Sequence, residues 1–227
     1  MSHLEHQVIL SGGINHVFEE SSSVLETLGR SHGFISHHVR HPDQAFELLK
    51  TEAIKLFTVN ALFWEMHGEK YDPHREQWYF AISDQQQEIL QTFVSRGGRL
   101  LGLHTASICF SNCPDWSNHL GGHWEWTASF HPPPEPLEIT PTPEGERMGL
   151  KAFTTIDEQY CSLHRAEGTV PLMTATSRAG VTETVVWCRQ VGRFKSAYSA
   201  LGHDARAMMN QVTSGLLPRL VEWLRQD

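Results

Sequence analysis

The chain alternates short apolar runs with amphipathic stretches, and each pair fits a strand followed by a helix. The runs at 7–10, 34–39, 54–59 and 99–103 predict strands because each is short and stops at glycine or polar turn residues. The stretches at 19–31, 42–50 and 83–96 carry apolar residues at helical spacing. This alternation is typical of an α/β protein whose parallel sheet is covered by helices on both faces.

The helix that follows Ser83 has the clearest boundaries in the sequence. Ser83 and Gln86 have the spacing of a capping box, in which each side chain bonds to the backbone of the other residue. Gly97 and Gly98 then predict the end of the helix, because glycine readily adopts the left-handed conformation found there. The strand at 99–103 follows at once.

The second half of the chain is less regular. Strands are expected at 137–140, 184–189 and 195–201, and one C-terminal helix is expected at 212–225, with Pro218 in its first turns. Prolines flank the first of these strands, which favours an edge position in the sheet. Since there is no internal repeat or linker, and 227 residues can bury one large core, we expect a single domain over 1–227.

Two segments interrupt the rhythm of strands and helices. The first, 60–80, is polar and rich in aromatic residues, and the second, 111–136, is rich in proline and glycine. Long irregular connections inside a compact domain are usually lids or binding loops. Both segments are therefore predicted to be active-site loops.

Charge and composition exclude several classes of protein. With 26 acidic and 18 basic residues the net charge is -8, and no dense basic run offers a footprint for nucleic acid. No apolar stretch reaches the roughly 20 residues needed to span a bilayer, and the N-terminus lacks the pattern of a secretion signal. These features favour a cytoplasmic protein with neither membrane nor nucleic-acid partners.

The four cysteines are too few and too scattered for a disulfide scaffold, so reduced thiols are expected. Cys109 and Cys113 could share a helical face, but Pro114 follows and no CxxC pair exists, which disfavours a structural metal site. A hydrolase with one of these two thiols as nucleophile is retained as a minor alternative.

The strongest chemical signal is a set of histidines at predicted strand ends and turns. The strand 99–103 runs directly into His104 at a strand-to-helix turn, the place where α/β proteins concentrate their chemistry. His16 and His203 follow other predicted strands, and His131 lies in a proline-rich turn. In a parallel sheet, the three histidines that follow strands, His16, His104 and His203, would meet at one edge. Imidazole transfers protons or ligates metals, so all four are candidate metal ligands.

Two carboxylates complete the candidate chemistry. Glu158 follows a short strand-like run and could share the same crevice, while Asp204 adjoins His203 and could fix the tautomer of a neighbouring histidine. An equally good interpretation is that Asp204 caps the helix that follows it. The catalytic candidates are His104, His203, Glu158 and Asp204.

Tryptophans in the two irregular segments suggest a sugar ligand. Aromatic faces pack against the C–H faces of a sugar ring and leave its hydroxyls for polar groups. Trp64, Trp78, Trp124 and Trp126 lie in these segments rather than at periodic core positions. The alternative is that such rings simply cover the edge of the sheet.

Several short motifs carry a resemblance that spans nearly the whole chain. They are Ser11-Gly12-Gly13 with His16, Gly102-Leu103-His104-Thr105-Ala106, Gly121-Gly122 with His131-Pro132, Asp157-Glu158-Gln159-Tyr160, Val186-Trp187, and Gly192-Arg193 leading into Leu201-Gly202-His203-Asp204. In this order and spacing the set resembles the ThuA-like (trehalose utilisation) proteins of the class I glutamine amidotransferase-like superfamily. Thr105, where a glycine is common, and Phe194-Lys195, where a more apolar start is common, depart from the pattern.

The resemblance implies a flavodoxin-like three-layer fold with His104 at the elbow where amidotransferases carry their nucleophilic cysteine. Because no Cys–His–Glu triad can be assembled around that elbow, glutamine hydrolysis is disfavoured. The family is linked to disaccharide catabolism through 3-keto sugars, which implies a functional link to a sugar dehydrogenase.

The leading hypothesis is therefore an enzyme that acts on a sugar or 3-keto-sugar, such as a disaccharide of the trehalose type. Its histidines and Glu158 would transfer protons or hold a divalent metal ion; proton transfer is slightly favoured because no tight ligand motif is present. The substrate-binding candidates are His16, Trp64, Trp124, His131 and Tyr160. No nucleotide cofactor is expected, and the sequence is compatible with a homo-oligomer without indicating one. The alternative is a non-catalytic carbohydrate-binding or regulatory module on the same fold.

Overall fold

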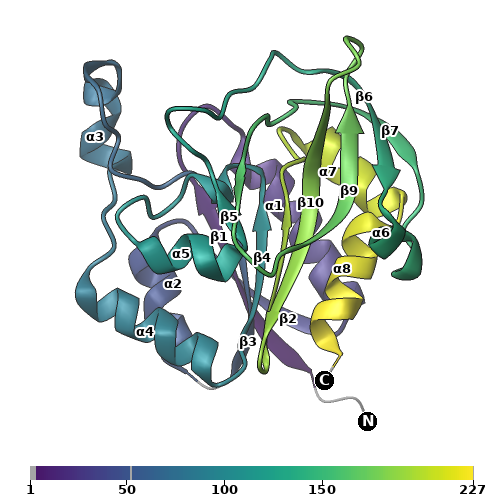
Figure 1. Ribbon diagram of the computed structural model, residues 1–227. Helices are drawn as coiled ribbons and strands as arrows, with labels where there is room; N and C mark the ends of the chain where they lie inside the picture. Colours follow the sequence, from purple (N-terminus) through teal and green to yellow (C-terminus); the bar gives the residue numbers. More distant parts are fainter. Residues whose placement is uncertain (1–3, 52, 227) are drawn as a thin grey trace.

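The structure is a computed structural model that describes residues 4–51 and 53–226, and it is organised around a nine-stranded sheet (Figure 1). The strand order is β2-β1-β3-β4-β11-β10-β9-β6-β7. The nine strands are β1 (Glu5–Gly12), β2 (Phe34–Val39), β3 (Ile54–Ala61), β4 (Arg99–Leu103), β6 (Glu135–Pro141), β7 (Phe153–Asp157), β9 (Val170–Thr176), β10 (Thr182–Val191) and β11 (Phe194–Ser199).

The first five strands in this order pair in parallel and carry helices on both faces. One layer contains α1 (Phe18–Ser31), α7 (Ala205–Thr213) and α8 (Leu216–Arg225). Within it, α7 contacts both α1 and α8. The other layer contains α2 (Pro42–Leu49), α4 (Asp84–Ser95) and α5 (Pro114–Leu120), seen on the left of Figure 1. The expected three-layer, flavodoxin-like fold is confirmed.

The remaining strands correct the expectation of a parallel sheet throughout. β10 pairs antiparallel with β11 and β9, to which tight turns join it, and β6 pairs antiparallel with β9 and β7. Gly180 and Gly192 lie in these turns with φ of 79° and 58°, where a side chain is strained. The predicted edge position of β6 is also wrong, since β7 pairs with its outer side and the two prolines lie near its ends.

Several predicted boundaries also change. The C-terminal helix predicted at 212–225 is observed as α8, with Pro218 in its first turn, but it begins at Leu216 because Gly215 adopts φ 86° there; the separate helix α7 before it was not predicted. The expected helix after His104 is only a four-residue 3₁₀ turn, η2 (His104–Ser107). The capping box of Ser83 and Gln86 is confirmed at the start of α4.

The two segments predicted as loops contain some regular structure. β3 continues to Ala61, and η1 (Glu69–Tyr71) and α3 (Asp72–Trp78) form an arm that projects from the body in Figure 1. The second segment holds α5 and β5 (Gly122–His123), which pairs with β8 (His164–Arg165); α6 (Pro143–Arg147) lies beyond it. In the described part of the chain, no helix is both long and apolar enough to cross a membrane.

Candidate functional site

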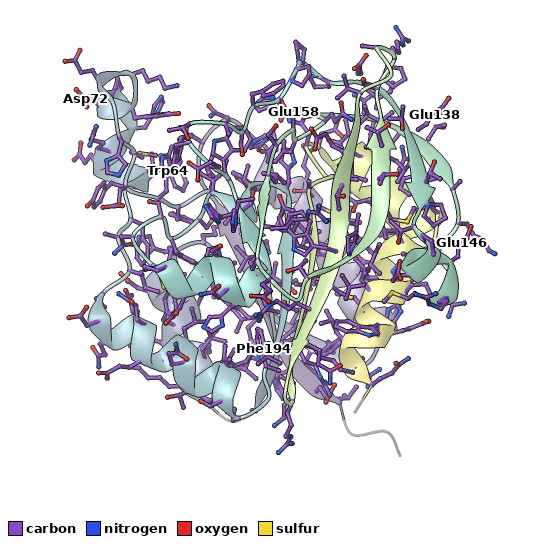
Figure 2. All side chains as sticks on the ribbon, viewed as in Figure 1. Trp64, Asp72, Glu138, Glu146, Glu158 and Phe194 are labelled. Atoms are coloured by element: carbon purple, nitrogen blue, oxygen red, sulfur yellow. The ribbon has the colours of Figure 1, made fainter. Side chains whose placement is uncertain are left out.

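Four side chains from distant parts of the sequence meet beyond the ends of the sheet strands. His16 follows β1, His104 follows β4, His203 follows β11, and Glu158 follows β7. One ligand atom from each lies within 4.8 Å of the others. Figure 2 shows Glu158 above the ends of the central strands. We call His16, His104, Glu158 and His203 the four-residue cluster; the predicted meeting of the three histidines is observed.

His104 is held in a strained and buried turn. Its φ is 45°, a left-handed value that non-glycine residues adopt only where the surroundings enforce it. The hydroxyl of Tyr198 donates to the carbonyl oxygen of His104 at 2.7 Å and lies 3.0 Å from Ser107 Oγ. Only 1% of His104 is exposed, so the fold fixes both its backbone and its ring.

The hydrogen bonds of His104 set its tautomer. Nδ1 lies 2.6 Å from the carbonyl oxygen of Ala200, which can only accept, so Nδ1 carries a proton. In the neutral ring the lone pair is then on Nε2, and it faces the hydroxyl of Tyr160 at 3.2 Å and Oε2 of Glu158 at 3.3 Å. A lone pair and a carboxylate oxygen at this distance repel unless a proton or a cation lies between them.

Glu158 is the hub of the cluster. Its Oε2 faces His104, and its Oε1 lies 3.3 Å from Nδ1 of His203 and 3.4 Å from Nδ1 of His131. Burial alone would raise the pKa of Glu158, but the hydrogen bond and charge of His104 and the charges of the other two histidines lower it to about 2. Glu158 is therefore ionised at neutral pH.

His16 completes the ring of ligand atoms as a neutral imidazole. Its ring centroid lies 5.0 Å from that of His104 and 4.8 Å from that of His203. Burial, followed by the charges of these two histidines, lowers the pKa of His16 to about 4. A neutral imidazole is the form that binds a metal.

Three buried polar atoms of the cluster lack a hydrogen-bond partner among the described residues. They are Nδ1 of His16, Nδ1 of His203 and Oε2 of Glu158. Buried polar groups are rarely left in this state unless a ligand or ion satisfies them. Three imidazoles and one carboxylate are a donor set that suits a divalent first-row metal ion, so these residues fit such an ion.

Asp157 positions the cluster, and sequence reasoning did not give it a role. The side chain is fully buried and accepts from the backbone N–H groups of Gly202, His203 and Glu158 at 2.7, 3.1 and 2.9 Å. Burial raises its pKa, while His104 and these three hydrogen bonds oppose the rise. The signal available in the sequence was a second carboxylate at the end of a strand beside Glu158.

Asp204 does not have the environment expected of a catalytic residue. Its Oδ1 accepts from the backbone N–H of Ala207 at 2.8 Å, and its Oδ2 lies 3.5 Å from Arg206. Asp204 is thus the N-cap of α7, which is the alternative interpretation of the sequence. The aspartate that holds the backbone of His203 in place is Asp157 instead.

A cavity of about 290 Å³ lies beside the cluster, and we call it the cluster pocket. Residues from both predicted active-site loops contribute to its wall. They are Asn15, His16, Leu62, Trp64, Lys70, Tyr71, Thr105, Ile108, Trp124, Trp126, Ser129, His131 and Tyr160. All five substrate-binding candidates are among them.

These candidates differ in what they can present to a ligand. His131 has a 40% exposed side chain and stacks on Tyr160 at 5.5 Å between centroids, and it contacts Glu158 from outside the four-residue cluster. Trp124 packs edge-on against Tyr160. Trp64 is only 2% exposed, so it supports the wall rather than offering an open face. Trp126, which the sequence places among the loop tryptophans but not among the substrate-binding candidates, is 51% exposed.

The thiols of the four cysteines are not part of the four-residue cluster. All four cysteines are free and buried. Burial raises the pKa of Cys109 to about 12, and its Sγ lies 3.0 Å from the carbonyl oxygen of Ala61. Burial also raises the pKa of Cys113. Since a thiolate is the reactive form, this environment opposes a cysteine nucleophile.

Comparison with protein families gives one match over nearly the whole chain. The sequence model of the family ThuA, described as trehalose utilisation, matches residues 8–224. No curated protein sequence matches the chain.

Solved structures share the fold at low sequence identity. A putative ThuA-like protein from Parabacteroides merdae is 18% identical with a TM-score of 0.78, covering 100% of this chain and 93% of its own. One from Bacteroides uniformis is 14% identical with a TM-score of 0.71, covering 98% and 91%. A cold-adapted β-galactosidase from Rahnella is 14% identical with a TM-score of 0.59, and the match covers 96% of this chain but 32% of the enzyme.

Proposed function

The chain belongs to the ThuA family, whose described role is trehalose utilisation, and on this premise we propose that it is an enzyme acting on a sugar or 3-keto-sugar. The observation that carries the proposal is the four-residue cluster beside an aromatic pocket. A strained histidine and a buried carboxylate surrounded by imidazoles are features of reactive sites rather than of simple packing.

Within this proposal, the four-residue cluster holds a divalent metal ion. The sequence slightly favoured proton transfer alone, because no tight ligand motif is visible in it. The folded geometry supports the metal, since one ligand atom of each residue lies within 4.8 Å of the others, and three polar atoms of the cluster are buried without partners. Such an ion would polarise a sugar carbonyl and lower the pKa of a bound water molecule.

The other residues have separate tasks in the proposed reaction. His104 keeps its proton on Nδ1 through Ala200, so Nε2 stays available to the cluster. Burial raises the pKa of Tyr160 well above its ordinary value, so its hydroxyl remains a donor. His131 is half-exposed, borders the cluster pocket and contacts Glu158, so we assign it the transfer of a proton between substrate and solvent.

The competing function is a non-catalytic carbohydrate-binding module that retained the fold. Sugar recognition needs only aromatic faces and hydrogen-bonding groups. A binding module would therefore not require the strained turn at His104 or the buried cluster atoms that lack hydrogen-bond partners. Those two features are the observations that favour the enzyme.

The test is incubation of the protein with a panel of 3-keto-disaccharides, with and without divalent metal ions, followed by NMR of the sugars. We expect conversion of at least one keto-sugar, stimulated by a metal ion and abolished by His104→Ala. Absence of conversion across the panel, together with sugar binding that His104→Ala leaves intact, would favour the non-catalytic module.

A further inference from the structure

A second cavity lies at the opposite end of the sheet from the four-residue cluster. Its volume is about 460 Å³, and it is bordered by the starts of β3, β4 and β11. In Figure 2, Phe194 at the start of β11 lies low on the molecule, whereas Glu158 lies near the top. We propose that this cavity, called the basic cavity below, binds a small phosphate ester. The proposal does not depend on the function proposed for the cluster.

Cationic side chains dominate the lining of the basic cavity. They are Lys55, Arg96, Arg99, Arg193 and Lys195. Among the described lining residues the one carboxylate is Glu5, whose Oε2 lies 2.8 Å from Arg99 and 3.3 Å from Arg225. The charge of Glu5 is therefore shared by two arginines and does little to offset the rest of the lining. This local excess of positive charge occurs in a chain whose net charge is -8.

Three of these cations, Lys55, Arg96 and Arg193, form no ion pair with any described residue. Most of the other arginines in the described chain do pair with a carboxylate. Like charges that converge on one cavity repel each other, and an anion bound between them removes this repulsion. The fold therefore brings together charges that a bound anion would stabilise.

Arg96 is held in place independently of any ligand. One Nη donates to the carbonyl oxygens of Leu49 and Thr51 at 2.9 and 2.6 Å, and the guanidinium lies 5.4 Å from the ring centroid of Phe93. Carbonyl oxygens carry no net charge, so these contacts fix the guanidinium without neutralising it. No hydrogen bond to a described residue uses its Nε or its other Nη. Because the group is already ordered, it can bind an anion at a low entropic cost.

Two other cations of the lining are largely buried. Lys195 is 6% exposed, and its Nζ donates to the carbonyl oxygens of Trp223 and Gln226 at 3.3 and 2.7 Å. The side chain of Arg99 is 13% exposed. A buried charge interacts with a ligand more strongly than a charge surrounded by water. The basic cavity thus combines these buried charges with the exposed ones of Lys55 and Arg193.

The charge and the size of the basic cavity indicate a phosphate ester. A phosphate monoester carries about -1.5 to -2 at pH 7 and three acceptor oxygens, which suit several cations better than a single carboxylate does. Guanidinium groups also bind phosphate oxygens in pairs. The volume lies within the range of roughly 300–1,000 Å³ found for small-molecule sites, so it exceeds the needs of free phosphate. The amides of Gln190 and Gln226 can bond to the rest of the ester.

The experiment measures binding of four probes to the whole protein by calorimetry. Glucose, glucuronate and glucose 6-phosphate share one ring and differ in charge, and inorganic phosphate supplies the charge without the ring. Glucose 6-phosphate should bind at least about tenfold more tightly than glucuronate or inorganic phosphate. Its affinity should fall as the salt concentration rises, because salt screens charges.

Variants locate the bound ester. Arg193→Gln should weaken binding of glucose 6-phosphate about tenfold, and Lys55→Gln should weaken it in the same direction. Both residues are exposed, so both variants should fold. Arg178→Gln is the matched control, because Arg178 is an exposed arginine in the turn between β9 and β10 and lines neither the basic cavity nor the cluster pocket. Arg178→Gln and His131→Ala, a change in the cluster pocket, should leave the affinity unchanged.

Several results would overturn the site. They are absence of binding by glucose 6-phosphate, binding of glucuronate or inorganic phosphate with equal affinity, and equal weakening by Arg193→Gln and Arg178→Gln. Weaker binding in His131→Ala but not in Arg193→Gln would place the ester in the cluster pocket and would also overturn it. None of these results depends on conversion of a keto-sugar, so this proposal and the proposed function can fail separately.

Discussion

Nε2 of His104 lies 3.3 Å from Oε2 of Glu158, and both atoms are acceptors when the histidine is neutral. The hydrogen bond from Nδ1 of His104 to the carbonyl oxygen of Ala200 excludes the tautomer in which only Nε2 carries a proton. This contact is stable only with a positive charge between the two atoms, either a shared proton or a bound cation. The chemistry proposed for this protein follows from that requirement.

Replacing His104 with alanine should abolish turnover and leave the fold intact. The side chain contributes a ligand atom and no large apolar surface, while loss of a group that takes part in the chemistry lowers rates by roughly 10²–10⁴-fold. NMR assays of a converted 3-keto-glycoside, with circular dichroism as the check on folding, measure both effects. His67→Ala, at a histidine with a 70% exposed side chain, is the control and should be fully active. Retained turnover in His104→Ala would remove the residue from the mechanism.

Asp157→Asn should destabilise the protein and weaken the site together. The amide is isosteric, but one of its two ends donates, so at least one N–H of Gly202, His203 or Glu158 loses its acceptor. Loss of a buried charge-assisted hydrogen bond costs about 1.5–3 kcal/mol. Urea unfolding measures the stability, and metal affinity measures the effect on the cluster. A stable variant with unchanged metal affinity would contradict the positioning role.

Asp204 provides the control for the Asp157→Asn variant, because it is an aspartate with a capping role in α7. Because it caps α7, Asp204→Asn should preserve both stability and turnover, and Asp204→Ala should lose about 1 kcal/mol of stability with turnover intact. Thermal or urea unfolding and the keto-sugar assay distinguish these outcomes. A large loss of turnover in Asp204→Asn would return the residue to the catalytic set.

The cysteines should be unreactive in the folded protein. Burial raises the pKa of Cys109 to about 12 and those of Cys161 and Cys188 to about 11, so the thiolate fraction at pH 8 is small. Iodoacetamide at pH 8 should modify the native chain slowly and leave turnover unchanged, whereas the unfolded chain should react at all four thiols. Mass spectrometry counts the modified sites. Rapid native alkylation with loss of turnover would revive the cysteine nucleophile.

The first half of the fold could be predicted from the sequence because local signals agree there. The apolar runs of β1 to β4 alternate with helices, and the capping box of Ser83 marks the start of α4. The fold of the second half could not be predicted in the same way, because it depends on which strands pair with each other. β7 and β9 carry weaker local patterns, and their antiparallel order is set by turns and by packing against β6 and β10.

The candidate site could be predicted only in part, for a related reason. The ends of parallel strands bring His16, His104 and His203 together, which strand order alone implies. The role of Asp157 depends on three backbone N–H groups that only the fold brings to it, two of them from the loop after β11. The burial of Trp64 likewise depends on packing that no local pattern reports.

Elemental analysis of protein purified without a histidine tag tests the central claim most directly. If the four-residue cluster holds a divalent ion, the purified chain should contain about one equivalent of a first-row metal such as zinc, manganese or iron. Glu158→Gln, which keeps the shape and removes the charge of the shared ligand, should lower the metal content and the thermal stability gained on adding metal. A metal-free wild-type protein whose melting temperature does not change with any added divalent ion would contradict the account.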